Sequence, residues 1–157
     1  MIYIGIDPGK SGAICVIDPS LILFSDKITF RAFSEGVYAD VLRHISGNGV
    51  RQDCFCIVEK VHAMPKQGVS SMFNFGANFG FIQGLLTAFR IPFQLVDPRT
   101  WTKSFGCGND KDEHIRTAQR LYPEVDMRRT ERCTKCHDGY ADALLMAEYG
   151  KRITTKV

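Results

Sequence analysis

The chain has 157 residues, of which 45% are hydrophobic and 24% are charged, and its formal net charge is +3. This composition is typical of a globular protein and argues against intrinsically disordered and fibrous classes. The length favours one domain spanning residues 1–157. The weak positive charge gives only slight support to a nucleic-acid partner.

The sequence also bears on location. The first residues lack a basic segment followed by an uninterrupted apolar run, because Asp7 interrupts them, so we expect a cytoplasmic protein. Six cysteines in such a protein indicate free thiols rather than a disulfide framework. The apolar stretch 71–95 contains several polar residues, which favours a buried helix and strand over a membrane span.

The first half of the chain predicts four strands and one helix. Apolar residues alternate from residue 2 to Asp7, and further strands are expected at 13–17 and about 22–30. Short turns join these three strands, so they should form an antiparallel meander. Residues 36–45 have helical spacing. Residues 54–59 form a continuous apolar run that predicts a buried strand, which the preceding crossover helix places parallel to the first.

The second half predicts four helices and a fifth strand. A long helix is expected at about 71–89, a strand at 92–96, and a short helix with Trp101 and Lys103 after Asp97 and Pro98. A helix at about 110–121 follows, then a polar loop over 124–137. The last helix is expected at 138–149, with Gly150 ending it.

Three glycines stand at intervals of four in the long helix: Gly76, Gly80 and Gly84. Residues four apart share one side of a helix. Because each glycine costs about 1 kcal/mol of helix stability relative to alanine, we expect another backbone to approach closely there. That backbone belongs to the sheet, to a neighbouring helix, or to the partner in a homodimer.

Four carboxylates form the candidate site. Asp7 and Glu59 end the first and fourth strands, which lie about 4.8 Å apart if they are parallel neighbours. Asp138 and Asp142 are four residues apart and so share one face of the last helix. This all-oxygen set suits Mg²⁺ or Mn²⁺, and two ions about 4 Å apart support phosphodiester hydrolysis. Individually, Asp7 is also explained as a turn residue, Glu59 as a surface ion-pair partner and Asp138 as a helix cap.

The motif GIDPGKSGAI, the acid ending the fourth strand and the segment ADALLMA in the last helix resemble the RuvC-type Holliday junction resolvases. The ending DGYADALLMAEYG is most similar to the phage-type branch. The resemblance implies a ribonuclease H-like α/β fold with a five-stranded mixed sheet in the order 3-2-1-4-5. It also implies a homodimer that nicks opposing strands of a four-way DNA junction with Mg²⁺ held by the four carboxylates, in DNA recombination, repair or phage DNA processing. The cytoplasm would then be that of a bacterium or a phage-infected cell.

The sequence departs from the family pattern in two places. The last two acids are four residues apart instead of three, so His137 is an alternative to Asp138 as ligand or base. Lys60, Val61 and His62 stand where bacterial members have an aromatic wedge, so the junction is opened either by His62, Met64 or Phe73 or in a different way. The resemblance further implies that Lys103 or Lys111 stabilises phosphate charge.

Candidate DNA contacts come from three segments. The loop after Glu59 is polar and basic, and further basic residues flank the fifth strand or lie in the polar loop 124–137. The residues assigned to DNA binding are Lys60, His62, Lys66, Gln67, Arg99, Arg128 and Arg129. Solvated surface loops of no special role are the alternative. A structural Zn²⁺ site formed by Cys133, Cys136 and His137 with Cys107 or His114 is less favoured than free thiols.

We therefore expect a metal-dependent endonuclease that resolves branched DNA. Two alternatives remain from the sequence. The first is a ribonuclease H-like nuclease acting on RNA, a flap or a fork. The second is a junction-binding protein that does not cleave, in which the acids are structural. An actin-like ATPase also begins with an Asp-Gly strand-turn, but its fold needs two such domains, which this length does not provide.

Overall fold

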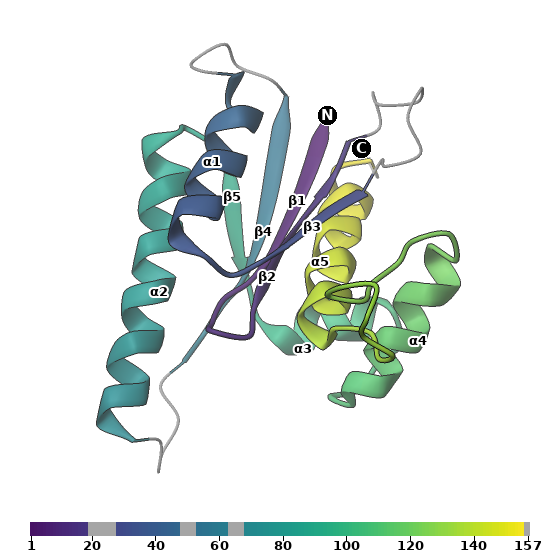
Figure 1. Ribbon diagram of the computed structural model, residues 1–157. Helices are drawn as coiled ribbons and strands as arrows, with labels where there is room; N and C mark the ends of the chain where they lie inside the picture. Colours follow the sequence, from purple (N-terminus) through teal and green to yellow (C-terminus); the bar gives the residue numbers. More distant parts are fainter. Residues whose placement is uncertain (19–27, 48–52, 63–67, 156–157) are drawn as a thin grey trace.

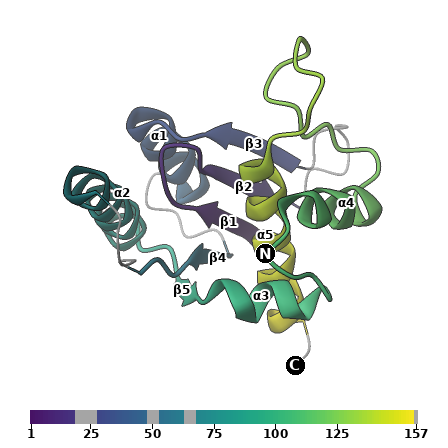
Figure 2. The same ribbon diagram turned by 90° about the horizontal axis from the view of Figure 1, so that it is seen from below.

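The computed structural model describes residues 1–18, 28–47, 53–62 and 68–155. Its elements are β1 (Ile2–Asp7), β2 (Ala13–Ile17), β3 (Ile28–Ala32), α1 (Glu35–Ile45), β4 (Cys54–Glu59), α2 (Val69–Ala88), β5 (Phe93–Val96), α3 (Pro98–Ser104), α4 (Lys111–Leu121) and α5 (Asp138–Thr154). Figures 1 and 2 show three layers, with α1 and α2 on one face of the sheet and α5 on the other. The predicted mixed α/β class is confirmed.

The sheet has the strand order β3-β2-β1-β4-β5. The β1–β2 and β2–β3 pairs are antiparallel, whereas β1–β4 and β4–β5 are parallel. These are the pairings that the short turns and the crossover helix predict. The third strand begins at Ile28 and ends at Ala32, two residues beyond the predicted end, and positions 22–27 lie outside the described residues.

Alternating side chains of the sheet enter two separate cores. Ile4 and Ile6 of β1 pack with residues of α1 and α2 such as Tyr38 and Leu86. On the other face, Ile57 of β4 belongs to a core cluster that also contains residues of α5, α3 and α4. Because side chains alternate along a strand, Asp7 and Glu59 fall on the same face as Ile57, toward α5. The alternation that builds the two cores therefore also aims both acids at one helix.

Helix α5 crosses directly over β1, and Gly5 makes the crossing possible. A Cβ atom at Gly5 would lie 2.0 Å from the Ala143 carbonyl oxygen and 2.6 Å from the Ala147 nitrogen. Only glycine fits such a contact between two backbones. The crossing holds the first turns of α5, and with them Asp142, next to the end of β1.

Two sequence-based expectations about glycines are wrong. Gly150 does not end the last helix, which continues to Thr154. A Cβ at Gly150 would lie 3.0 Å from Ile57 Cγ1, so this glycine serves close packing on β4 inside the helix. Nor do Gly76, Gly80 and Gly84 touch the sheet or a neighbouring helix, because nothing within the described chain lies within 4 Å of a Cβ built there. The third alternative, a partner in a homodimer, stays a prediction.

The other helices begin and end close to the predicted residues. The predicted helix at about 71–89 is found at Val69–Ala88, and the one at about 110–121 at Lys111–Leu121. Asp97 and Asp110 cap α3 and α4 by accepting backbone hydrogen bonds. Within the described ranges, no helix is both long and apolar enough to cross a membrane.

Candidate functional site

Asp7 and Glu59 lie side by side at one end of the sheet. The parallel register pairs Ile6 with Val58, and each acid follows directly in its strand. Both side chains are partly buried. The structure thus brings together the two acids that the sequence separates by more than fifty residues.

Asp142 completes a cluster of three acids. Its side chain is only 2% exposed, and Oδ1 lies 2.7 Å from His114 Nδ1. Oδ2 accepts a hydrogen bond from the Lys111 ammonium group. Both partners come from α4, which packs beside α5. Burying a carboxylate is costly unless the charge is paired, and here two basic side chains pair it.

The acids repel one another. Burial, together with the negative charges of Asp142 and Glu59, raises the pKa of Asp7 well above its usual value. Burial also raises the pKa of Glu59, although a hydrogen bond from Trp101 opposes that change. Burial opposes ionisation of Lys111, but its contact with Asp142 raises the pKa of the lysine overall. The negative charge of the acids is therefore offset in part by the Lys111 ammonium group and by the His114 ring, whose two nitrogens both face acceptors, and a metal cation would relieve the remaining repulsion.

The fourth predicted acid, Asp138, is placed differently. It is the first residue of α5 and is exposed, one turn from the buried Asp142. Its charge contributes to the raised pKa of Asp7, but less than those of Asp142 and Glu59. His137 precedes it and packs against Tyr140 with ring centroids 4.6 Å apart. Burial lowers the pKa of His137, and its buried Nδ1 has no hydrogen-bond partner among the described residues.

Sequence reasoning did not assign site roles to two buried aromatic residues that contact the acids. Trp101 Nε1 donates to Glu59 Oε2 at 3.0 Å. His114 contacts Asp142 and was considered only as a zinc ligand. Its hydrogen bond to Asp142 raises the pKa of His114 despite burial. The signal in the sequence was weak: Trp101 is the single tryptophan, and His114 lies on the α4 side opposite the exposed residues.

The two lysines expected to stabilise phosphate charge lie in different places relative to the acids. Lys111 contacts Asp142 and faces the acids, and its side chain remains 53% exposed. Lys103 is exposed on α3, and none of the described contacts joins it to the acids. Of these two residues, Lys111 is the one that the structure brings to the cluster.

The donor set suits a divalent metal ion in chemistry but not yet in arrangement. Carboxylate oxygens are the ligands that Mg²⁺ and Mn²⁺ prefer, and the like charges of neighbouring acids contribute to the raised pKa values of Asp7 and Glu59. Among the described residues, however, no three His, Cys, Asp or Glu side chains converge as a ready-made metal site. The Lys111 ammonium group takes the position of a cation on Asp142 Oδ2. A metal ion bound at Asp142 Oδ2 would take the place of this ammonium group.

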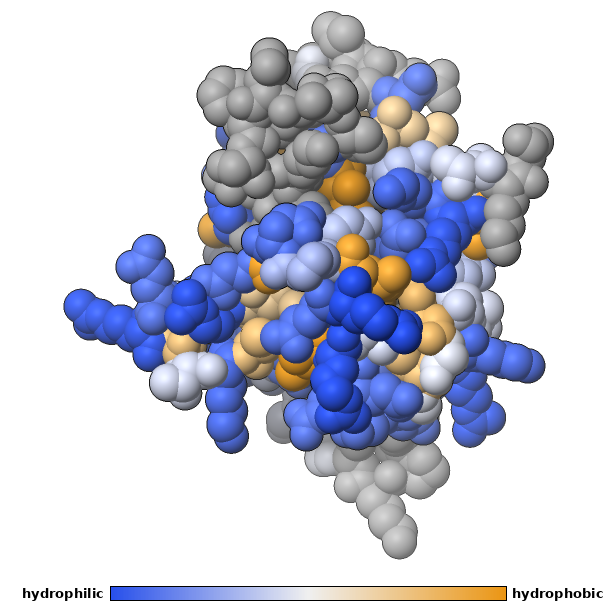
Figure 3. Space-filling view, turned by 90° about the vertical axis from the view of Figure 1, so that its right-hand side faces the viewer, coloured by the Kyte–Doolittle hydropathy of each residue, from blue (hydrophilic) through white to orange (hydrophobic). Residues whose placement is uncertain are grey.

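The predicted DNA contacts are scattered. Lys60, Arg99 and Arg129 are exposed, and His62 lies 3.8 Å from Asp97. Arg128 is held by Asp126 through hydrogen bonds of 2.7 to 3.1 Å. Lys66 and Gln67, like Met64, lie outside the described residues. Figure 3 shows that the face carrying α4 is dominated by hydrophilic residues.

The cysteines do not form a metal cluster within the described part of the chain. Cys107 is buried, with Sγ 3.2 Å from Thr117 Oγ1. Cys133 contacts Thr130, while Cys136 contacts Gln119. His114, the alternative fourth zinc ligand, is already engaged by Asp142 and by the Gly108 carbonyl.

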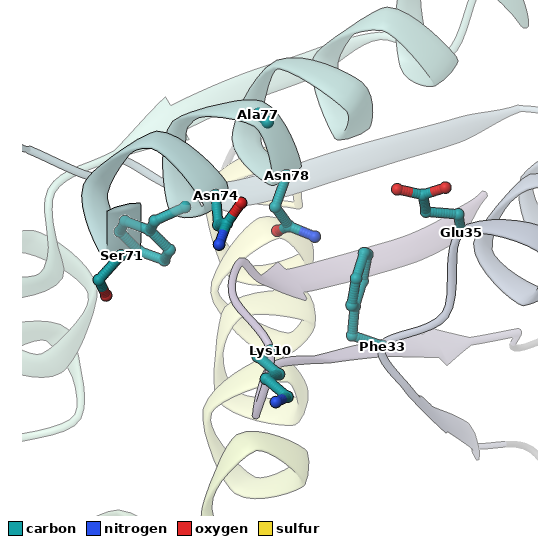
Figure 4. Close-up of a pocket in the computed structure, with 8 residues that line it drawn as sticks. Lys10, Phe33, Glu35, Ser71, Asn74, Ala77 and Asn78 are labelled. Carbon is teal, nitrogen blue, oxygen red and sulfur yellow. The ribbon is translucent and has the colours of Figure 1, made fainter. Parts of the chain in front are cut away.

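A cavity of about 540 Å³ has a lining that includes none of Asp7, Glu59 and Asp142, and Figure 4 shows the residues that line it. It opens between α2, the β1–β2 turn and the start of α1, and its lining includes Lys10, Phe33 and Asn78. Asn78 Oδ1 accepts a hydrogen bond from the Gly9 nitrogen at 2.9 Å, which ties α2 to the turn that follows Asp7. The cavity belongs to the α1–α2 face, so the acids do not line it.

Comparisons with known proteins concern the fold. No family model matches the chain, and no curated protein matches it by sequence. Among solved structures, Thermus thermophilus RuvC has a TM-score of 0.57 at 14% identity, covering 98% of both chains. The same protein in complex with a Holliday junction substrate has a TM-score of 0.60 at 14% identity, covering 99% of this chain and 98% of that one. The chain therefore has a RuvC-like fold over its whole length.

Proposed function

We propose that this chain is a metal-dependent endonuclease that resolves four-way DNA junctions. The observation that supports this most is the meeting of Asp7, Glu59 and the buried Asp142 at one end of the sheet. The likeness to a RuvC structure that holds a Holliday junction supports the choice of substrate. We further propose that residues 1–157 act as one ribonuclease H-like nuclease domain of the phage-type branch, in the cytoplasm of a bacterial or phage-infected cell.

In this proposal Asp7, Glu59, Asp142 and the exposed Asp138 hold two Mg²⁺ ions, for which Mn²⁺ substitutes. Bound there, the ions supply the Lewis acidity that activates a water and stabilises the leaving oxygen. In this hydrolysis a water oxygen would bond to phosphorus and give its proton to a nearby base, while the bond from phosphorus to the leaving oxygen breaks and that oxygen takes up a proton from solvent water. Lys111, released from Asp142, offers its positive charge to the phosphate. His137 is the alternative to Asp138 as the base.

The test is Mg²⁺-dependent incision of a synthetic mobile four-way junction, read for paired symmetric nicks. Asp7→Asn and Asp142→Asn are expected to abolish nicking, while junction binding persists because phosphate contacts provide most of the affinity. Arg116→Ala is a matched control, since Arg116 lies on the exposed side of α4 beside Asp110. Cleavage that persists in both Asp7→Asn and Asp142→Asn would contradict the assignment of the site.

We also propose a homodimer that uses α2. The exposed Gly76, Gly80 and Gly84 leave room for a second backbone, and the exposed Val69 and Phe73 lie on the same helix. A helix with apolar residues on several sides favours burial on more than one of them. Light scattering of the purified protein gives the mass directly. Gly80→Arg is expected to yield a monomer. A dimer that persists in this variant would contradict an interface formed by α2.

A second candidate is a ribonuclease H-like nuclease with another substrate. It is favoured by the cluster of Asp7, Glu59 and Asp142, which supports phosphodiester hydrolysis without indicating a branched substrate. Cleavage rates on four-way, three-way, flap and RNA–DNA substrates separate the two. Equal rates on branched and unbranched duplexes would favour this candidate over a junction resolvase.

A further inference from the structure

We propose that Trp101 and His114 form an aromatic frame that fixes the orientation of Glu59 and Asp142. Each ring holds one oxygen of one acid and leaves the other oxygen for a cation. The inference rests on the proposed metal site at these acids, but it concerns different residues. Trp101 and His114 are positioning residues, because they contact the carboxylates and not the substrate.

The contacts run in an unbroken series from one acid to the other. Trp101 Nε1 donates to Glu59 Oε2 at 3.0 Å. The two rings meet edge to face, with centroids 5.1 Å apart and an angle of 61° between their planes. His114 Nδ1 then lies 2.7 Å from Asp142 Oδ1. The frame thus links a side chain on β4 to one on α5 through the intervening helices α3 and α4.

The frame is anchored so that neither ring can turn freely. His114 Nε2 lies 2.9 Å from the Gly108 carbonyl oxygen, which can only accept a hydrogen bond, so both ring nitrogens are engaged. Trp101 is 1% exposed and His114 is 4% exposed. Buried rings in close packing keep one rotamer. The two carboxylates are therefore held by donors that do not move when a ligand arrives.

The position of Lys111 indicates which oxygen is left for a cation. Its ammonium group contacts Asp142 Oδ2, the oxygen opposite the one held by His114. His114 thus contacts one oxygen of Asp142, and the Lys111 ammonium group contacts the other. An apolar ring at either frame position would fill the volume but leave one carboxylate oxygen without its hydrogen-bond partner, so the polar atoms are what the site requires.

The test measures Mn²⁺ binding to the protein alone, without DNA, by the electron paramagnetic resonance signal of free Mn²⁺. Trp101→Phe keeps a ring and removes the donor to Glu59. His114→Gln places a donor near Nε2, whereas His114→Asn places one near Nδ1, the atom that faces Asp142. Loss of a hydrogen-bonding partner behind a metal ligand typically weakens binding about 10- to 100-fold. We expect that loss in the first two variants and a change of less than about threefold in His114→Asn.

Thermal unfolding in EDTA separates positioning from folding. His114→Gln and His114→Asn should unfold at similar temperatures yet differ in Mn²⁺ affinity. If both bind Mn²⁺ as the wild type does, or weaken equally, the frame is overturned while the metal site stands. If the wild type binds no Mn²⁺, the proposed function fails and the frame fails with it.

A second measurement needs no metal. The chain has one tryptophan, so its single indole N–H resonance reports on the contact with Glu59. Glu59→Gln replaces a charged acceptor by a neutral one and should shift that resonance upfield. Asp97→Asn, at the exposed cap of the same helix α3, is the control and should leave it in place. An indole resonance that is unchanged in Glu59→Gln would refute the contact on which the frame depends.

Discussion

Replacing Gly5 with alanine tests how the fold builds the site. The new Cβ would lie 2.0 Å from the Ala143 carbonyl oxygen, although such contacts are essentially never shorter than 3.0 Å. Helix α5 must therefore move away from β1 by about 1 Å or more, since both contacting groups are backbone. Overpacking of this kind costs typically about 1–3 kcal/mol, and a clash with rigid backbone falls at the upper end.

The same displacement should remove activity before it removes the fold. For a chain of this length, about 3 kcal/mol corresponds to a fall in Tm of roughly 6–12 °C. Moving Asp142 by about 1 Å relative to Asp7 is expected to lower the rate of junction cleavage about 100-fold. Cleavage is measured at a temperature well below the Tm of the variant, so that loss of folded protein does not contribute.

Gly36→Ala is the matched control. Gly36 lies in α1, and nothing within the described chain lies within 4 Å of a Cβ built there. Alanine is the better helix residue, so this variant should be as stable as the wild type or more so by up to about 1 kcal/mol. A Gly5→Ala protein with unchanged Tm and full activity would refute the close crossing of α5 over β1.

Three further predictions follow from individual contacts. Because burial and like charges raise the pKa of Asp7, the folded chain binds this proton more tightly than the unfolded chain, whose value is near 3.8. Stability is then lost as the pH rises through the folded pKa, so Asp7→Asn should raise the Tm at pH 7 in EDTA, each pKa unit being worth about 1.4 kcal/mol. Asn78→Ala leaves the Gly9 nitrogen without its acceptor and should cost about 1–3 kcal/mol in urea unfolding, whereas the exposed Asn74→Ala should change stability by less than about 0.5 kcal/mol. Tyr122→Phe removes a 2.6 Å hydrogen bond to Glu148, which keeps Arg152 as a partner, and should cost about 1–2 kcal/mol by the same method.

The strands and their pairing were accessible from sequence because local pattern determines them. Alternation in β1 and the continuous apolar run of β4 each reflect which faces are buried, and short turns leave only antiparallel neighbours. The roles of the glycines were harder to predict from the sequence. Gly150 was taken as a helix end, whereas it makes room for Ile57, and a packing contact of that kind depends on a residue far away in the chain.

Some residues of the candidate site could likewise be predicted from local sequence pattern, and others could not. Asp7 and Glu59 could be found because each ends a strand whose direction was predicted. The partners of Asp142 could not, because the contact of α4 with α5 leaves no periodicity that distinguishes His114 from an ordinary buried residue. Lys111 was proposed only by family resemblance, and the structure supplies the geometric reason, its contact with Asp142 Oδ2.

The arrangement of the acids also explains why the fold tolerates an unfavourable cluster of charge. Asp7 and Glu59 could be relieved by turning outward, but a hydrogen bond from Trp101 holds Glu59 in place. Asp142 has no outward path, since its side chain is buried where α5 crosses β1. The repulsion is therefore built into the packing and is only partly neutralised by the half-exposed Lys111 and the buried His114. A cation that displaces this lysine gains the attraction of several acids while the lysine returns to water, so binding of metal and release of Lys111 toward the phosphate should be one coupled event.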